Sequence, residues 1–233
     1  MKTIGIIGAM EEEISALREI SEIINVKNIA ESDFYMCKLS GKNVVLNRCG
    51  IGKVNAAIAT QIMIDMYGVD CVINIGLAGA INEDLKIGDI VVSSDAIHHD
   101  FDATGFGYKL GEIPRASTSE FVADDKLIQA AKQCAILANI KREQIHIGRV
   151  ATGDVFVSDK EEKEFIWRKF NAYCAEMEGA AIAQTCYLNK LPFVIIRSIS
   201  DTADGDAEGD FNKNIDQISK NAYRILEEMV KEL

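Results

Sequence analysis

Residues Ala175-Glu176-Met177-Glu178-Gly179-Ala180 join an apolar segment to a run of small residues, and this junction decides the fold that the sequence predicts. The segment before it, Phe170 to Cys174, is mostly apolar and predicts a strand. In open α/β folds, ligands bind beyond the carboxyl ends of the strands. The junction therefore predicts that Glu176 and Glu178 lie at the ligand-binding edge of a sheet.

Two accounts of these carboxylates are open from the junction alone. On an extended backbone, Glu176 and Glu178 point the same way and Met177 points the other way, as a binding site would need. Acidic residues are also favoured in the first turn of a helix, where they interact with the positive end of its dipole. Carboxylates at other strand ends would favour the first account.

The rest of the chain repeats the strand-to-helix pattern. Apolar β-rich runs predict buried strands, and apolar residues at helical spacing predict helices. The expected strands are residues 3–8, 71–75, 90–96, 146–151 and 193–201, with one antiparallel hairpin in 23–46. One helix is expected to begin at residue 11 and another at residue 158 or 159. A third follows the junction at 175–180 and ends at about residue 188. Further helices are expected over 53–67, 124–139 and 211–233. The pattern predicts one α/β domain over residues 1–233, a three-layer sandwich whose mixed, mostly parallel central sheet is flanked by helices.

Chemically distinctive residues follow several of these strands. They are Glu13, the segment Gly76 to Gly79, Phe156, Glu178 and Asp201. Because the carboxyl ends of parallel strands meet at one edge of a sheet, we expect these residues to form a single site.

The composition argues against several classes of partner. The net charge of −11 argues against binding to nucleic acid or to an anionic membrane surface. The six cysteines are scattered and form no Cys-x-x-Cys pair, which indicates a reducing compartment. The N-terminus does not resemble a signal peptide, and no apolar run reaches the ~20 residues that span a bilayer. We therefore expect a cytoplasmic protein.

Familiar cofactor motifs are incomplete in this chain. Gly5-Ile6-Ile7-Gly8 lacks the glycine spacing of a dinucleotide site, and Gly50-Ile51-Gly52-Lys53 is followed by Val54 where a phosphate loop has Ser or Thr. The run His98-His99-Asp100 has no third ligand at metal-site spacing. We expect no metal and no cofactor.

Three stretches closely resemble the bacterial 5'-methylthioadenosine/S-adenosylhomocysteine nucleosidases of the nucleoside phosphorylase superfamily. They are Gly8-Ala9-Met10-Glu11-Glu12-Glu13, the junction at 175–180, and Arg197-Ser198-Ile199-Ser200-Asp201. The resemblance covers essentially the whole chain and extends to residues 50–54, 85–92 and 123–127. It implies hydrolysis of the N-glycosidic bond of 5'-methylthioadenosine and S-adenosylhomocysteine to adenine and the 5'-thioribose. It also implies hydrolysis of 5'-deoxyadenosine. Such a reaction serves methionine salvage and the recycling of S-adenosylhomocysteine.

The resemblance also implies roles for individual residues. Glu13 would activate the attacking water, Asp201 would protonate the departing adenine, and Glu178 would hold the ribose hydroxyls. The other implied substrate-binding residues are Met10, Ile51, Ala78, Gly79, Phe156, Val157, Glu176, Met177, Arg197, Ser200 and Phe211. The resemblance further implies a homodimer in which Phe106 and Pro114 complete the site of the partner subunit.

The chemistry of such a reaction agrees with this residue set. Adenine leaves readily only when a ring nitrogen is protonated, which requires an acid with a raised pKa. Carboxylates stabilise the oxocarbenium-like sugar. Phosphate, the alternative nucleophile, would meet three successive glutamates after the first strand, and Leu77 donates no side-chain hydrogen bond where many relatives have Ser. These features predict water as the nucleophile.

Other readings of the same residues remain open from the sequence. Glu13 is also a helix-start acid, Phe156 and Met177 are also candidates for core packing, and Arg197 is also suited to pairing a buried carboxylate. At the level of function, the alternatives are a phosphorylase, a hydrolase of another nucleoside such as futalosine, and a nucleoside-binding protein without activity.

Overall fold

The computed structural model describes residues 3–203 and 221–233. Its strands are β1 (Thr3–Gly8), β2 (Glu22–Ile29), β3 (Ser32–Leu39), β4 (Lys42–Arg48), β5 (Cys71–Ala80), β6 (Ile90–His98), β7 (Phe121–Val122), β8 (Ile145–Thr152), β9 (Cys174–Glu176) and β10 (Phe193–Asp201). Its α-helices are α1 (Glu11–Ile20), α2 (Lys53–Tyr67), α3 (Asp125–Leu137), α4 (Lys160–Phe170) and α5 (Gly179–Leu188). Residues 221–232 form a further helix at the C-terminus, and two short 3-10 helices occupy Thr104–Phe106 and Arg142–Gln144.

The strands form one mixed sheet that partly closes on itself. The first half of β5 lies between β1 and β10, whereas its last residues pair with β9 where β1 has ended. Since β9 continues to β8, β6 and back to β10, these strands form a ring. Strands β1, β4, β3 and β2 extend the sheet away from the ring.

The balance of strand directions differs from the sequence prediction. Within residues 3–203 and 221–233, five pairings are parallel (β1–β4, β1–β5, β5–β10, β6–β8, β8–β9) and five are antiparallel (β2–β3, β3–β4, β5–β9, β6–β7, β6–β10). The mixed sheet flanked by helices is confirmed, but a mostly parallel sheet is not. The ring also means that three flat layers do not describe the architecture.

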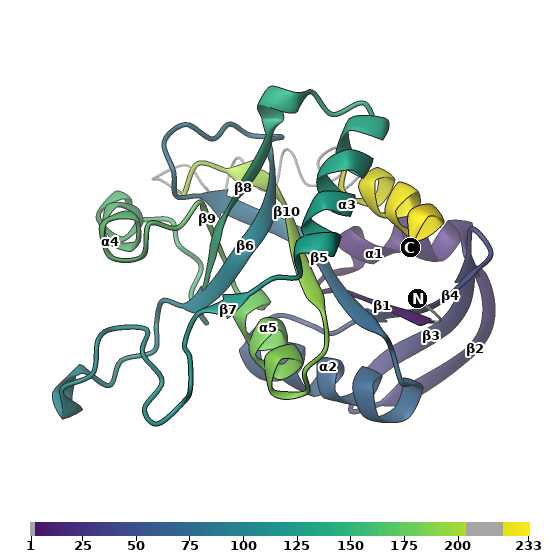
Figure 1. The fold of residues 1–233 in the computed structure, drawn as a ribbon, viewed down its shortest axis with the longest axis horizontal. Coiled ribbons are helices and arrows are strands. Elements are labelled where there is room, and N and C mark those ends of the chain that lie inside the picture. The colour runs from purple at the N-terminus through teal and green to yellow at the C-terminus, as the bar shows by residue number, and fades with distance from the viewer. Residues whose placement is uncertain (1–2, 204–220) are drawn as a thin grey trace.

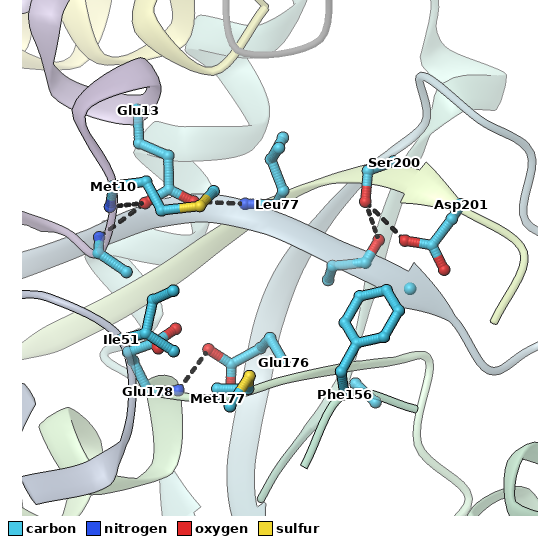
Figure 2. Close-up of a pocket in the computed structure, with 14 residues that line it drawn as sticks. Met10, Glu13, Ile51, Leu77, Phe156, Glu176, Met177, Glu178, Ser200 and Asp201 are labelled. Atoms are coloured by element: carbon cyan, nitrogen blue, oxygen red, sulfur yellow. Dashed lines mark hydrogen bonds between the residues drawn. The ribbon is translucent and has the colours of Figure 1, made fainter. Parts of the chain in front are cut away.

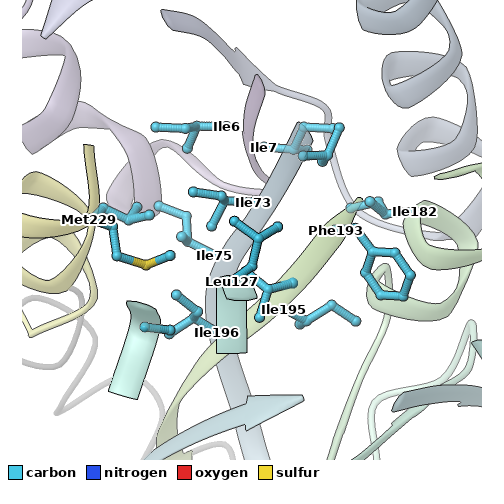
Figure 3. Packing of buried hydrophobic residues seen from close by; sticks show 14 of the residues in the cluster. Ile6, Ile7, Ile73, Ile75, Leu127, Ile182, Phe193, Ile195, Ile196 and Met229 are labelled. Carbon is cyan, nitrogen blue, oxygen red and sulfur yellow. The ribbon is translucent and has the colours of Figure 1, made fainter. Parts of the chain in front are cut away.

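Helices cover both faces of the sheet. In Figure 1, α1, α3 and the yellow C-terminal helix gather above the sheet, and α2 and α5 lie side by side below it. Successive strand residues point to opposite faces of the sheet, so each strand contributes side chains to the packing under the helices on both faces. Ile6 and Ile7, for example, point to opposite sides of β1 (Figure 3). Ile73, Ile75 and Met229 belong to the buried cluster on one side, and Ile182 and Phe193 pack on the other (Figure 3).

Three local expectations need correction. The expected hairpin at 23–46 consists of three strands, because the chain also turns at Ala30 and Glu31, which both have positive φ. Strand β5 continues through Gly76 to Gly79, whereas the strand was expected to end at residue 75. The strand before the 175–180 junction is only β9, since Phe170 ends helix α4.

Other expected features are confirmed. Asp159 is the N-cap residue of α4, and its carboxylate accepts hydrogen bonds from the N–H groups of Glu161 and Glu162. Gly68 ends α2 in the left-handed conformation. The expected loop at 202–210 and most of the expected helix at 211–233 lie outside the described residues, where only 221–232 is seen as helix. In the part of the chain that the structure describes, no helix is long and apolar enough to span a bilayer.

Candidate active site

Strand register brings the ends of β5, β8, β9 and β10 together. Gly79 of β5 pairs with Ala175 of β9 on one side and with Asp201 of β10 on the other. Thr152, the last residue of β8, pairs with Glu176. A cavity of about 360 Å³ opens at these ends, a size typical of small-molecule sites. It is lined by Ala9, Met10, Glu13, Ile51, Leu77, Ala78, Gly79, Phe156, Ala175, Glu176, Met177, Glu178, Ser200 and Asp201 (Figure 2).

A β-bulge at Ser200 places Asp201. Ile199 pairs with Ala78 and Asp201 with the very next residue, Gly79, so Ser200 is an extra residue on β10. Bulges re-aim side chains next to functional sites. Asp201 Oδ2 accepts a hydrogen bond of 2.8 Å from Ser200 Oγ, and Oδ1 accepts one of 2.9 Å from the N–H of Ala203. A Cβ on Gly79 would lie 2.8 Å from Asp201 Oδ1, so only glycine permits this close approach.

Glu13 is the buried member of the three glutamates that open α1. Its Oε2 accepts from the N–H groups of Ala9 (2.6 Å) and Met10 (3.0 Å), and its Oε1 accepts from the N–H of Leu77 (3.1 Å). Burial raises its pKa, although Arg197 and the three N–H donors act in the opposite direction. Glu13 therefore both caps the helix start and presents a carboxyl group with raised basicity to the cavity.

Leu77 contributes to this arrangement through its backbone. The hydrogen bond to Glu13 comes from its main-chain N–H, so the leucine side chain does not affect it. The neighbouring Gly76 is essential in another way, because a Cβ there would lie 2.6 Å from Glu13 Oε1 and 3.0 Å from Arg197 Nη1. The Gly76 to Gly79 segment is thus part of strand β5, and its glycines allow side chains from β10 and α1 to approach.

Glu176 is the partner of the buried Arg197. Its Oε2 forms a short contact with Arg197 Nη2, and its Oε1 accepts from Thr152 Oγ1. The N–H groups of Glu178 and Gly179 also donate to this carboxylate, at 3.2 Å and 2.7 Å to Oε2. Five donor–acceptor contacts therefore fix Glu176 among the described residues, and they connect it to Arg197 and to the start of α5.

Arg197 supplies positive charge behind the cavity without lining it. Its side chain is 1% exposed, and Nη2 also donates to Asn74 Oδ1 at 2.5 Å. Burial alone would lower its pKa, but the carboxylates of Glu176, Glu13 and Glu178 raise it, so the guanidinium stays charged. The buried ion pair with Glu176 that the sequence allowed is present, and substrate binding by Arg197 stays a prediction.

Glu178 does not cap its own helix, although it occupies the N-cap position of α5. Its Oε1 instead accepts a hydrogen bond of 2.8 Å from the N–H of Gly52, at the start of α2. Burial, followed by the charge of Glu176, raises the pKa of Glu178 to about 8. A carboxyl group in this state can both donate to and accept from a pair of hydroxyl groups.

The remaining predicted site residues lie in several places. Met10, Met177, Ile51 and Phe156 line the cavity, and the last two are 55% and 47% exposed at its mouth (Figure 2). Val157 is buried but does not line it. Phe106, which is 88% exposed, and Pro114 lie in the loop between β6 and β7, away from the cavity lining, and Phe211 lies outside the described residues.

The sequence analysis missed contributions made by backbone or by distant supports. Ala9 and Ala175 line the cavity, and Thr152 and Asn74 hold Glu176 and Arg197. A small apolar residue or a main-chain N–H gives no recognisable signal in a sequence. The described residues contain no cluster of three His, Cys, Asp or Glu side chains suited to a metal ion.

Comparison with known proteins identifies the family. A family model described as the phosphorylase superfamily matches residues 3–231. A curated protein of Tolumonas auensis, a 5'-methylthioadenosine/S-adenosylhomocysteine nucleosidase, is 43% identical over 231 residues, which is 99% of each chain. The chain belongs to the 5'-methylthioadenosine/S-adenosylhomocysteine nucleosidase family of the phosphorylase superfamily.

Solved structures of this superfamily share the whole fold. The nucleosidase of Neisseria meningitidis, in complex with methylthio-immucillin-A, has a TM-score of 0.93 and 42% identity, with all of both chains covered. The futalosine hydrolase of Helicobacter pylori has a TM-score of 0.94 and 34% identity, and the match covers 100% of this chain and 98% of that one. One fold and one arrangement of elements thus serve nucleosidases with different substrates.

Proposed function

We propose that this chain hydrolyses the N-glycosidic bond of 5'-methylthioadenosine and S-adenosylhomocysteine, and also of 5'-deoxyadenosine. The products are adenine and the 5'-substituted ribose, in methionine salvage and S-adenosylhomocysteine recycling. The observation that carries the proposal is the placement of carboxyl groups from separate elements, Glu13, Glu178 and Asp201, around one cavity. The family of the chain supports it.

The proposed mechanism places the leaving group at Asp201. Its carboxyl group donates a proton to a ring nitrogen of adenine, so that the base departs neutral. Phe156 stacks on the purine, and the backbone of Val157 contacts the purine edge. Ser200 orients the acid through the hydrogen bond to Oδ2. Ala78 and Gly79 form the wall beside the glycosidic bond.

The sugar and the water occupy the other half of the cavity. Glu178 binds the ribose hydroxyls, and Met10 and Met177 pack against the sugar. Glu13 accepts a proton from the attacking water, and its raised pKa suits a general base. The negative charge of ionised Glu13 stabilises the oxocarbenium-like transition state. No cofactor is needed. Ile51 and Phe211 are proposed to surround the 5'-substituent.

Water, rather than phosphate, is the proposed nucleophile. Four carboxyl groups line the cavity, and the described lining residues include no Lys, Arg or His. The nearby Arg197 is held by Glu176 and Asn74. A phosphate dianion would therefore meet like charge, and no cation among the described lining residues is available to bind it.

Chromatographic analysis of reaction products tests the proposal. The nucleoside panel contains 5'-methylthioadenosine, S-adenosylhomocysteine, 5'-deoxyadenosine, adenosine and a futalosine-type nucleoside, the last because of the likeness to a futalosine hydrolase. We expect adenine from the 5'-thio substrates at equal rates with and without phosphate, and no ribose 1-phosphate. Release that requires phosphate would identify a phosphorylase. No release of adenine from any member of the panel would contradict the proposal.

A homodimer with shared active sites is part of the proposal. The outward face of α2 and α5 exposes large apolar side chains, Val54 (69%), Ile58, Met66 (55%) and Leu188 (69%). Patches of this kind favour association between protein surfaces. Since α2 begins next to Ile51 at the cavity mouth, a partner bound here can bring its Phe106 and Pro114 to the site.

Subunit complementation tests the shared site. We expect Phe106→Ala to bind substrate poorly and Asp201→Asn to be inactive, each as a homodimer. In a mixed dimer, one site combines an intact Asp201 with the partner subunit's intact Phe106. Random mixing by co-expression should therefore restore about a quarter of wild-type activity, since half of the dimers have one intact site. Activity no higher than the mean of the two variants, or a 25.6 kDa monomer by light scattering, would argue against sharing.

We further propose a single phosphorylase-type domain over residues 1–233 in the cytoplasm. The superfamily match from residue 3 to residue 231 supports one domain. All six cysteines are free and buried, as expected of a protein in a reducing compartment. The net charge of −11 supports neither nucleic acid nor anionic membrane as a partner.

A further inference from the structure

Three residues beside the cavity form a closed set of hydrogen bonds. Lys53 Nζ lies 2.7 Å and 2.6 Å from the two carboxylate oxygens of Asp100. Asp100 Oδ2 also accepts from the N–H of Asp154 at 2.9 Å, and Asp154 Oδ1 accepts from the N–H of Lys53 at 2.8 Å. Each residue thus contacts the other two, and we refer to Lys53, Asp100 and Asp154 as the clasp.

The clasp connects three segments that are far apart in the sequence. Lys53 is the first residue of α2, Asp100 follows β6, and Asp154 follows β8. Ile51, two residues before Lys53, and Phe156, two residues after Asp154, both lie at the mouth of the cavity. The clasp therefore ties together the two backbone segments that carry opposite walls of the mouth (Figure 2).

The clasp also reaches the ribose-binding carboxyl group. Consecutive N–H groups at the start of α2 donate in two directions, that of Gly52 to Glu178 Oε1 and that of Lys53 to Asp154 Oδ1, both at 2.8 Å. A Cβ on Gly52 would lie 3.1 Å from Asp154 Oδ1, so the backbone approaches this carboxylate closely. Movement of the Lys53 backbone would carry the Gly52 donor away from Glu178.

From this geometry we infer that the clasp residues position the substrate: they set the distance between the Ile51 and Phe156 walls and hold the Gly52 donor on Glu178. The inference rests on the proposed nucleosidase function. None of the three residues lines the cavity, so they act through Gly52, Ile51 and Phe156. The Lys53 and Asp100 side chains are 21% and 25% exposed, so solvent screens their pairing only in part, and global stability is measured beside KM.

Lys53→Met is the decisive variant, because methionine is an unbranched side chain only one atom shorter than lysine and removes its charge. We expect KM for 5'-methylthioadenosine to rise about tenfold while kcat stays within about threefold, since the acids that perform the chemistry are untouched. Lys53→Arg should restore most of the KM. In Lys53→Met/Asp100→Asn, the second change should add little, because both remove the same pairing.

Amide hydrogen exchange supplies a second reading that needs no substrate. In Lys53→Met, we expect peptides covering residues 50–56 and 153–157 to exchange at least several times faster, with the rest of the chain unchanged. Lys231→Met is the matched control, because it removes ion pairs to Glu227 and Glu228 on the C-terminal helix. The control should change neither KM nor exchange in these two segments.

The two measurements separate failure of the clasp from failure of the proposed function. If the wild-type protein cleaves no nucleoside, the function is wrong, and exchange still tests whether the clasp orders the segments. Unchanged exchange in both segments of Lys53→Met overturns the clasp. Faster exchange with unchanged KM, or a lower melting temperature with unchanged KM, shows a structural contact only and also overturns the inference.

Discussion

Asp201→Asn should lower kcat for adenine release by about 10²–10⁴-fold, the usual contribution of a general acid. Asparagine has nearly the same shape and has no proton to transfer at neutral pH. It can still accept the hydrogen bond from the N–H of Ala203 through Oδ1. Ser200 Oγ, which lies 3.3 Å from the carbonyl oxygen of Ala78, can turn to donate there and accept from the new amide. The variant should therefore fold normally.

A substrate with a good leaving group provides the control. In the 5'-methylthioriboside of 4-nitrophenol, the leaving group 4-nitrophenolate is a stable anion that needs no protonation, so Asp201→Asn should cleave this substrate at close to the wild-type rate. Ser200→Ala, which removes the contact to Oδ2 and keeps the acid, should lose no more than about tenfold on the natural substrate. Adenine release within tenfold of wild type in Asp201→Asn would show that another group protonates the base.

Arg197→Met should lower the free energy of unfolding by about 3–5 kcal/mol, the usual cost of leaving a buried charge unpaired. Arg197 is buried and in contact with Glu176, and its charge also acts on Glu13 and Glu178. Without it, the pKa values of Glu13 and Glu178 should rise further, because burial already raises both and the charge of Arg197 now opposes that rise. Urea-induced unfolding at pH 7 measures the change.

Two further variants distinguish a buried pair from a general effect of mutation. Arg197→Met/Glu176→Gln removes both charges, and it should recover at least about 1 kcal/mol of the loss. Arg18→Met removes a partly exposed pair with Glu11 on α1 and should cost less than about 1 kcal/mol. A loss below 1 kcal/mol in Arg197→Met, or no recovery in the double variant, would contradict the assignment of Arg197 to charge balance.

Much of the fold could be predicted because local patterns are strong where the chain is buried on both faces. The apolar runs of β1, β10 and the first half of β5 identify strands without ambiguity. The turn at Ala30 and Glu31 was missed because neither residue is a typical turn former, and β9 because three residues carry no periodicity. Closure of the ring depends on non-local pairings such as β5–β9, which no local pattern encodes.

The site was predictable where an acid follows a strand. Asp201 and Glu178 were found in this way, and the structure places both at the cavity. The choice of Glu13 over Glu11 and Glu12 rested on family resemblance, because only the fold buries one of three adjacent glutamates. The function of Glu176 was unreadable for the same reason, since its partners Thr152 and Arg197 are distant in the sequence.

Strand β5 contacts two of the three carboxyl groups proposed to carry the reaction. The N–H of Leu77 holds Glu13, and Gly79, two residues later, receives Asp201 against its Cα. Two residues of strand span roughly 7 Å, so the β5 backbone sets where the Glu13 and Asp201 carboxyl groups are held relative to each other. Strand β5 pairs with β10 along one side and with β1 and β9 along the other. Because these pairings fix its register, the distance between the two positions on β5 changes only in whole-residue steps. Ile51 and Phe156 approach the cavity from other segments, so substrate preference can vary at the mouth without a change in this spacing.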